Sequence, residues 1–309
     1  MKDTYTNPIM ESGADPWVIL SGDAYYYCCS SVNNSISLAR SEKLEELGKA
    51  ELVKVYEAPK GTQHSAEIWA PELHFACGSW YIYYAADDGD NMHHRMYVLR
   101  GGSNPLDPLD GEYSFVGKVA DPADKWAIDG TILEHDGKLY FIWSGWEGDE
   151  NIKQDIFIAP MSNPWTISGD RVRISTPDHE WERNGNPWVN EGPEILKHGN
   201  AVHIIYSASG SWTDEYCLGR LTCTDGNFLN PGSWVKAGPV FAKANDVFGP
   251  GHASFVKSKD GERDYIVYHA AKYSGAGWNR DVRLQQFGWE GDNPLFGEPV
   301  KAGEELPCP

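Results

Sequence analysis

The 309-residue sequence lacks long apolar runs, and this absence argues against a membrane-spanning helix. None of its hydrophobic stretches reaches the roughly 20 residues that a membrane-spanning helix needs. The first residues, MKDTYTNPIM, carry neither the basic nor the apolar region of a secretory signal peptide. We therefore expect a protein with no membrane partner, cytoplasmic unless a signal has been removed.

Cysteine is also sparse, and its spacing argues against two classes of site. The six cysteines form no CxxC pair, which speaks against a structural zinc site. They are too few for a dense disulfide framework in a chain of this length. We expect buried free thiols, with Cys217 and Cys223 as the pair to check for a bridge if the protein is secreted.

Basic residues are outnumbered, and this excludes the common polyanionic partners. There are 26 Lys and Arg against 45 Asp and Glu, which gives a formal net charge of −19. Such a chain repels nucleic acid and anionic lipid surfaces. A neutral or cationic ligand fits the charge better, so neither nucleic acid nor a membrane is an expected partner.

Aromatic residues, by contrast, are abundant. The chain has 13 Trp and 16 Tyr, and aromatic residues make up 13% of it. Trp and Tyr suit half-buried β-strands, and their flat apolar rings also suit the faces of sugar rings. Packing in an all-β core explains most of them, while those near loops are candidates for a binding site.

A phrase that recurs five times organises the chain. Each copy has a turn, a short strand, a Gly or Asp turn and an aromatic strand. The copies begin at Ala14, Trp69, Ala127, Asn190 and Gly249. Because a regular internal period indicates one repeated supersecondary unit, the pattern predicts an all-β, five-bladed β-propeller that forms a single domain over residues 1–309. The charged stretch Ser41–Tyr56 is expected to be an irregular crossover between the first two units.

One slot of the repeat holds an ionisable residue in every copy. The occupants are Asp15, Glu72, Asp129, Glu191 and His252. Equivalent positions of a radial array point toward a common axis, so these side chains are expected to meet there. Any one acid alone could be a solvated or capping residue, but three acids in register around one axis are costly to bury without a chemical use.

The three acids Asp15, Asp129 and Glu191 suit hydrolysis of a glycosidic bond. This reaction needs a base that activates water on one face of the sugar and an acid that protonates the leaving oxygen on the other. Different neighbours can hold one carboxylate ionised and keep another protonated at neutral pH. The pattern therefore predicts a catalytic domain, with a sugar-binding propeller as the non-enzymatic alternative.

The phrases ADPWV, WAPEL, AIDGT, NEGPEIL and GPGHASF together resemble glycoside hydrolase family 43. The resemblance extends from Asn7 to about Pro299. Members of that family are five-bladed β-propellers that act by inversion on polysaccharides containing arabinose or xylose. The resemblance implies that Asp15 is the general base, Asp129 tunes the pKa of the acid and orients it, and Glu191 is the general acid.

The same resemblance suggests supporting roles for two further residues. Arg283 in DVRLQQF matches the arginine that accompanies the general base, although an ordinary strand ion pair is its alternative. His252 matches a histidine near which several relatives hold calcium or another ion through water, although it could simply hydrogen-bond across the channel. We expect no cofactor to be required, and a calcium or other ion on the propeller axis is the one candidate.

Within the family, the phrases WAPELHF and FIWSGWEG look most like those of exo-acting α-L-arabinofuranosidases. This predicts release of arabinose from arabinan or arabino-oligosaccharides, with a β-xylosidase, a bifunctional enzyme or an endo-arabinanase as alternatives. Trp69 and Trp146 are predicted to stack on sugar rings and Glu72 to bind sugar hydroxyls. Trp69 could instead pack between blades, and Glu72 could form an inter-blade hydrogen bond.

Overall fold

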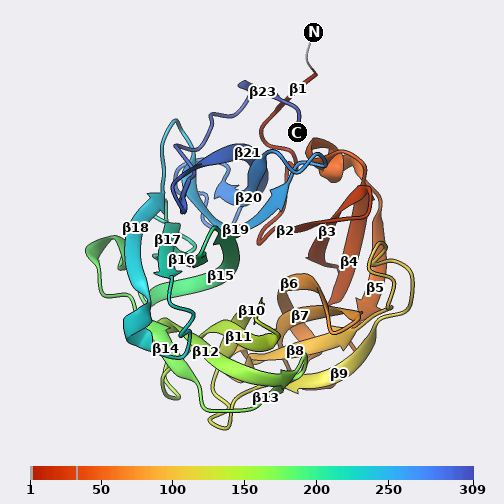
Figure 1. Cartoon of the computed structure of the whole chain (residues 1–309), viewed down its shortest axis with the longest axis vertical. Helices are drawn as coiled ribbons and strands as arrows, with labels where there is room; N and C mark the ends of the chain where they lie inside the picture. Colours follow the sequence, from red (N-terminus) through yellow and green to blue (C-terminus); the bar gives the residue numbers. More distant parts are fainter. Residues whose placement is uncertain (1–2, 33) are drawn as a thin grey trace.

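The computed structural model describes residues 3–32 and 34–309, and most of its ordered elements are β-strands. The strands form five blades around a central axis, and the chain runs through the blades in sequence order (Figure 1). In each blade the first strand lies nearest the axis, and the next strands follow outward. The predicted five-bladed β-propeller is therefore confirmed.

The blades are antiparallel sheets. Blade 1 contains β2 (Trp17–Ser21), β3 (Ala24–Ser31), β4 (Ser35–Ser41) and β5 (Leu52–Glu57). Blade 2 contains β6 (Ala66–Ala76), β7 (Ser79–Asp87), β8 (Arg95–Arg100) and β9 (Ser114–Val119). Blade 3 contains β10 (Ala127–His135), β11 (Lys138–Gly145) and β12 (Lys153–Asn163), with the short β13 (Thr166–Ile167) and β14 (Val172–Ser175) paired to β12.

The last two blades repeat the same arrangement. Blade 4 contains β15 (Trp188–His198), β16 (Ala201–Ala208), β17 (Cys217–Cys223) and β18 (Val235–Phe241). Blade 5 contains β19 (Phe248–Lys257), β20 (Asp264–Ala271), β21 (Arg280–Glu290) and β22 (Asn293–Leu295). Short 3-10 helices lie in the connections: η1 (Leu44–Lys49), η2 (Asn91–His93), η3 (Glu180–Glu182) and η4 (Pro231–Ser233).

The stretch Ser41–Tyr56 differs from its prediction. It folds into η1 and most of β5, the outermost strand of blade 1, rather than into an irregular crossover. The sequence signal for β5 is weak because the strand lies at the edge of its sheet, where none of its side chains is buried.

The hydrophobic core is divided into five clusters, each between two neighbouring blades. Ile82 and Leu38 belong to the cluster of blades 1 and 2, and Ile142 and Ile204 to that of blades 3 and 4. Each sheet therefore buries apolar side chains from both of its faces, which explains why the blades read as strongly aromatic and aliphatic runs.

The two ends of the chain close the ring. Strand β1 (Thr4–Thr6) pairs with β23 (Glu305–Pro307), so the N-terminal and C-terminal segments lie side by side (Figure 1). The buried side chain of Asn7 then bonds to both backbone groups of Leu284 in β21, at 2.8 and 2.9 Å. These contacts fasten the segment that leads into blade 1 against blade 5.

The cysteines agree with the expectation of free thiols, since none of the six is in a disulfide. Cys217 and Cys223 begin and end the same strand, β17, and are therefore too far apart to bridge. In the part of the chain that the structure describes, no helix has the length and apolar character needed to cross a membrane.

Candidate active site

In each blade, one residue within the innermost strand or two residues before it has a positive φ close to the axis. These positions are Asp15 (49°), Ala70 (41°), Asp129 (53°), Gly192 (53°) and His252 (44°). In blades 2 to 5 the pairing register with the next strand shifts at this position. Such bulges re-aim side chains, and here they turn one residue per blade toward the axis.

This shared conformation corrects the slot inferred from the repeat. Asp15, Asp129 and His252 are equivalent, but Glu191 comes one residue before its positive-φ position and Glu72 two residues after its own. A displacement of two residues along a strand is about 6.5 Å. Glu72 therefore lies deeper along the axis than the sequence alignment implied.

One pocket of about 480 Å³ brings together four of the five ionisable residues of the repeat slot. Asp15, Asp129, Glu191 and His252 all line it. Tryptophans from several blades form much of the remaining wall, together with polar side chains: Glu67, Trp69, Asn91, Trp126, Gln154, Trp212, Trp278 and Arg280. Acids that are far apart in the sequence thus meet in an aromatic-walled cavity.

Asp15 is held through one of its two carboxylate oxygens. Oδ1 lies 3.2 Å from Nδ1 of His252 and 3.5 Å from Nη1 of Arg280. Burial alone would raise the pKa of Asp15, but His252 and Arg280 outweigh burial and hold the pKa well below its usual range. Asp15 is therefore ionised, and Oδ2 is available to accept a hydrogen bond from water.

His269 positions the backbone of Asp15. Its Nδ1 accepts a hydrogen bond from the backbone N–H of Asp15 at 3.0 Å. Burial and the charge of Arg280 lower the pKa of His269 to about 3, so the ring is neutral and can accept at this nitrogen. The sequence analysis did not identify His269, which lies in the middle of an aromatic strand with no distinguishing spacing.

Asp129 and Glu191 are both buried and raise each other's pKa. Gly192 N–H donates to Oδ2 of Asp129 at 3.0 Å, and the Tyr216 hydroxyl donates to Oε1 of Glu191 at 2.8 Å. Burial, opposed by His252 but reinforced by Glu191, raises the pKa of Asp129 to about 8, and burial also raises that of Glu191. The pair therefore retains a proton at neutral pH. A backbone amide donates to Asp129 and a hydroxyl donates to Glu191, and both bonds favour an ionised carboxylate, so the retained proton belongs to the pair.

His252 is the cation among these acids. Burial by itself lowers the pKa of His252, but Asp15, Asp129 and Glu191 reverse the effect and raise it above its ordinary value. Its backbone N–H donates to Oγ of Ser207 at 2.8 Å, which fixes the strand beside Glu191. A protonated His252 offsets part of the cost of burying three carboxylates together.

The arginine beside the base is Arg280, so the prediction of Arg283 was wrong. Arg283 forms a buried two-point ion pair with Asp281, at 2.7 and 3.0 Å, and makes none of the contacts to Asp15. Arg280 begins β21, and Arg283 lies three residues, or about 10 Å, further along that strand. Both arginines occur in the phrase RDVR, and only the register of β21 distinguishes them.

Of the two predicted tryptophans, one lines the pocket and the other does not. Trp69 forms part of the wall, whereas Trp146 is 1% exposed and stacks behind Trp126 at a ring-centroid distance of 4.8 Å. Trp126 is the member of this stacked pair that faces the cavity. Trp126 and Trp278 were not predicted from the sequence, although Trp126 directly precedes the AIDGT phrase.

Glu72 does not reach the pocket, so its predicted contact with sugar hydroxyls is also corrected. Its Oε2 lies 2.9 Å from Nε2 of His74 on the same strand, and its side chain lines a narrow axial channel below the pocket. Glu72 lies in this channel because it comes two residues after the bulge at Ala70 in β6.

The axial channel also bears on the ion expected near His252. Glu72, Glu194, Asp15 and His252 line it, and Oε2 of Glu194 is buried without a partner. Carboxylates suit calcium, but the space is about 10 Å³, which is room for about one water. Burial and the neighbouring Glu72 raise the pKa of Glu194 well above its usual value. The channel therefore fits a proton and a single water, and does not fit a hydrated ion.

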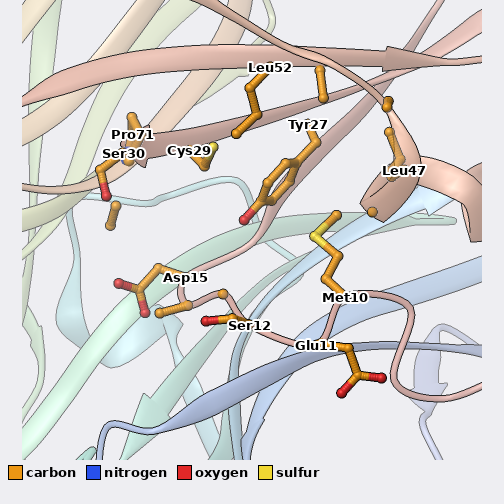
Figure 2. A pocket seen from close by; sticks show the side chains of 16 residues that line it. Met10, Glu11, Ser12, Asp15, Tyr27, Cys29, Ser30, Leu47, Leu52 and Pro71 are labelled. Atoms are coloured by element: carbon orange, nitrogen blue, oxygen red, sulfur yellow. The ribbon is translucent and has the colours of Figure 1, made fainter. Parts of the chain in front are cut away.

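A second cavity of about 500 Å³ adjoins Asp15 on the side of blade 1. Its walls come from residues 10–15, the end of β3, the connection through η1, and Ala70 and Pro71 of β6. Figure 2 shows the hydroxyl of Tyr27 pointing toward the segment that carries Ser12 and Asp15. Because Ser12 and Ser30 are exposed, solvent reaches this cavity from the surface.

The chemistry that the pocket can perform follows from the protonation states of Asp15 and of the acid Glu191. An ionised carboxylate, Asp15, and an acid that shares a retained proton with Asp129, Glu191, line the same cavity. Such a pair can remove a proton from water and donate a proton to a leaving oxygen in one step. The tryptophans supply flat apolar surfaces for a sugar ring.

Comparisons with known proteins agree with this chemistry. Residues 5–294 match the family model described as glycosyl hydrolases family 43. The chain is 39% identical, over 97% of its length, to an extracellular exo-alpha-(1->5)-L-arabinofuranosidase of Streptomyces avermitilis, and it covers 64% of that protein. A protein of the same name from Streptomyces chartreusis is 36% identical over 87% of the chain and is covered to 83%.

Among solved structures, an alpha-L-arabinofuranosidase from Lactobacillus brevis superposes with a TM-score of 0.89. It is 34% identical in sequence, and the alignment covers 97% of this chain and 98% of the other. This full-length superposition shows that the two chains share one fold.

Proposed function

The chain belongs to glycosyl hydrolase family 43, and we propose on this premise that it is an inverting exo-α-L-arabinofuranosidase. The substrate would be arabinan or arabino-oligosaccharides, from which the enzyme releases arabinose. The relatives that carry this activity in their names support the proposal, although the chain spans only 64% of the length of the Streptomyces avermitilis protein. The observation that carries it is the pocket that brings an ionised Asp15 together with Asp129 and Glu191, which retain a proton between them.

In the proposed reaction Asp15 acts as general base. Oδ2 accepts a proton from a water molecule as the water oxygen bonds to the anomeric carbon of the terminal arabinose. The cavity beside blade 1 gives solvent a route to Asp15 that does not pass through the sugar pocket. Attack from this side, opposite the leaving group, inverts the anomeric configuration.

Glu191 would act as general acid in the same step. As the bond from the anomeric carbon to the leaving oxygen breaks, Glu191 donates its proton to that oxygen. Burial, reinforced by the charge of Asp15, keeps the pKa of Glu191 raised until this moment, and the Tyr216 hydroxyl holds the carboxyl group in place. The proton gained by Asp15 returns to Glu191 through solvent before the next turnover.

Product analysis tests the proposed activity. Incubation with linear arabinan should release monomeric arabinose, and arabinoxylan should show whether branch residues are also removed. Release of mainly dimers and trimers would identify an endo-arabinanase instead. Faster hydrolysis of an aryl β-D-xyloside than of an aryl α-L-arabinofuranoside would identify a β-xylosidase.

A variant of the acid tests the assignment of roles. Glu191→Ala should lose about 100- to 10,000-fold in kcat on arabinan, because the poor leaving group needs protonation. The loss should be much smaller on 4-nitrophenyl arabinofuranoside, whose leaving group needs little protonation. Equal losses on both substrates would remove Glu191 from the acid role, and activity that survives Asp15→Ala would remove Asp15 from the base role.

The place where the protein works remains a prediction. Two of the relatives are named extracellular, which differs from the cytoplasmic location expected above for a chain from which no signal has been removed. Immunodetection of the native protein in cell and culture fractions distinguishes the two locations.

A further inference from the structure

Behind the pocket wall lies a buried polar pair that the proposed reaction does not use. His94 follows η2, Asp87 ends β7, and both side chains are completely buried. The imidazole of His94 stacks on the indole of Trp69, with ring centroids 4.0 Å apart and planes inclined by 24°. Trp69 lines the pocket and His94 does not, so His94 supports this part of the wall from behind.

Both nitrogens of His94 face oxygen atoms. Nε2 lies 3.0 Å from the backbone carbonyl of Glu67, and Nδ1 lies 2.9 Å from Oδ2 of Asp87. A carbonyl can only accept, so Nε2 must carry a proton. Without a second proton, the lone pair of Nδ1 and the carboxylate would repel each other in a site closed to water. Neither Nδ1 nor Oδ2 has a hydrogen-bond partner of regular geometry, so the 2.9 Å approach of these two buried atoms requires a proton that they share.

The backbone that His94 supports is irregular. Glu67 has a φ of 47° and Ala70 a φ of 41°, and the pairing of β6 with β7 shifts register on both sides of Trp69. Positive φ is costly for residues with a Cβ, and it persists where surrounding contacts determine the conformation. The bond from Nε2 to the Glu67 carbonyl is such a contact.

His94 also connects blade 2 to blade 3. Its carbonyl accepts from the backbone N–H of Ala127, two residues before Asp129, at 3.3 Å. Nearby, Nε1 of Trp126 donates to the carbonyl of Asn91 at 2.8 Å. Four residues of the pocket wall, Glu67, Trp69, Asn91 and Trp126, are thus held by the segment that His94 anchors.

We propose that His94 is a positioning residue for the sugar pocket, acting with Asp87 as a unit that shares one buried proton. The unit fixes the Trp69 indole and the Glu67 backbone as a preformed surface for the sugar ring. This inference rests on the proposed function, because it takes the pocket to hold a sugar.

The variant His94→Phe tests the proposal. Phenylalanine keeps a ring behind Trp69 but removes both polar contacts, so Glu67 and Trp69 lose their fixed position. We expect KM for arabinotriose to rise about tenfold, with a smaller change in kcat. Asp87→Asn, whose amide can donate to Nδ1, should give a KM between those of the wild type and His94→Phe.

A matched control is available in blade 4. His203 is equally buried and also has two polar contacts, to Oγ1 of Thr222 at 2.9 Å and to the Asp292 carbonyl at 2.7 Å, but it does not line the pocket. His203→Phe should lower Tm as His94→Phe does, while KM stays at the wild-type value. A proton NMR spectrum should show a strongly downfield resonance that His94→Phe and Asp87→Asn abolish and His203→Phe retains.

Three outcomes would overturn the proposal. These are an unchanged KM in a folded His94→Phe variant, an equal rise of KM in His203→Phe, or the absence of the downfield resonance. If His94→Phe does not fold, the Asp87→Asn variant and the resonance still decide. Failure of the proposed function is a separate result, since it would appear as a wild-type protein that releases no arabinose.

Discussion

At the scale of single residues, the neighbouring groups and not the residue type set the pKa of each carboxylate and therefore its role. Asp15 and Asp129 have the same side chain and the same left-handed backbone conformation. Asp15 faces His252 and Arg280 and is ionised, whereas Asp129 faces Glu191 and has a raised pKa. The direction of each pKa shift gives a pH profile that can be measured.

The alkaline side of the profile should report the Asp129 and Glu191 pair. Because both pKa values are raised, that of Asp129 to about 8, kcat/KM should fall as pH rises through the weakly alkaline range. Asp129→Asn removes the negative charge that keeps the proton on Glu191, so this limb should move to lower pH. Rate measurements from pH 5 to about 10 test this, and an unmoved limb would contradict the role of Asp129.

The acid side of the profile should report Asp15. Arg280 helps to hold the pKa of Asp15 low, so Arg280→Gln should raise that pKa and move the acid limb of kcat/KM to higher pH. Arg283→Gln is the matched control, since Arg283 pairs with Asp281 instead. It should lower stability without moving the limb. A shift in the Arg283 variant and none in the Arg280 variant would contradict the assignment.

The sequence was sufficient to predict Asp15, Asp129 and Glu191 but not their partners. The acids occur in distinctive phrases, and each is followed by Pro or Gly at a turn into the innermost strand. The choice of Arg280 over Arg283, and of Trp126 over Trp146, depends on strand register and on which ring of a stacked pair faces the cavity. Such choices are set by packing between blades, which no single phrase encodes.

At the scale of elements, the bulges in the innermost strands position the site. In β10 and β15 the positive-φ residue marks the shift of register, and beyond it the strand pairs regularly with the next strand of the blade. The five aromatic strands were predictable because both faces are buried. The edge strand β5 was not, because its exposed side chains leave no periodic signal.

The N-terminal segment is an element whose contribution can be measured. Asn7 bonds to both backbone groups of Leu284 and is buried, so Asn7→Ala should lower the free energy of unfolding by about 1–3 kcal/mol. Thermal or urea denaturation measures this loss. Because Asn7 closes the ring far from the pocket walls, KM for arabino-oligosaccharides should not change. A variant with wild-type stability would show that β1 and β23 close the ring without it.

At the scale of the whole molecule, the propeller allows acids from three blades to share one axis. The buried negative charge there is offset by His252, Arg280 and retained protons. The five-fold repeat made the architecture predictable from sequence. The size of the axial channel was not predictable from the sequence, because the packing of the innermost strands leaves a space of only about 10 Å³ there.

Removal of metal tests this balance. Prolonged treatment with EDTA, followed by desalting, should leave kcat, KM and Tm unchanged, because protons and side chains already compensate the axial carboxylates. Addition of calcium to the treated protein should restore nothing. A loss of activity that calcium reverses would contradict the account and would require the axial channel to open around an ion.

The central claim is that Asp15 and Glu191 hydrolyse a terminal arabinofuranosyl bond with inversion, and the configuration of the first product tests it most directly. Proton NMR spectra recorded during rapid hydrolysis of an α-1,5-linked arabino-oligosaccharide follow the anomeric signal of the released sugar before mutarotation. The account predicts that β-arabinose appears first and the α-anomer later. Initial appearance of α-arabinose, or no release of monomeric arabinose, would contradict it.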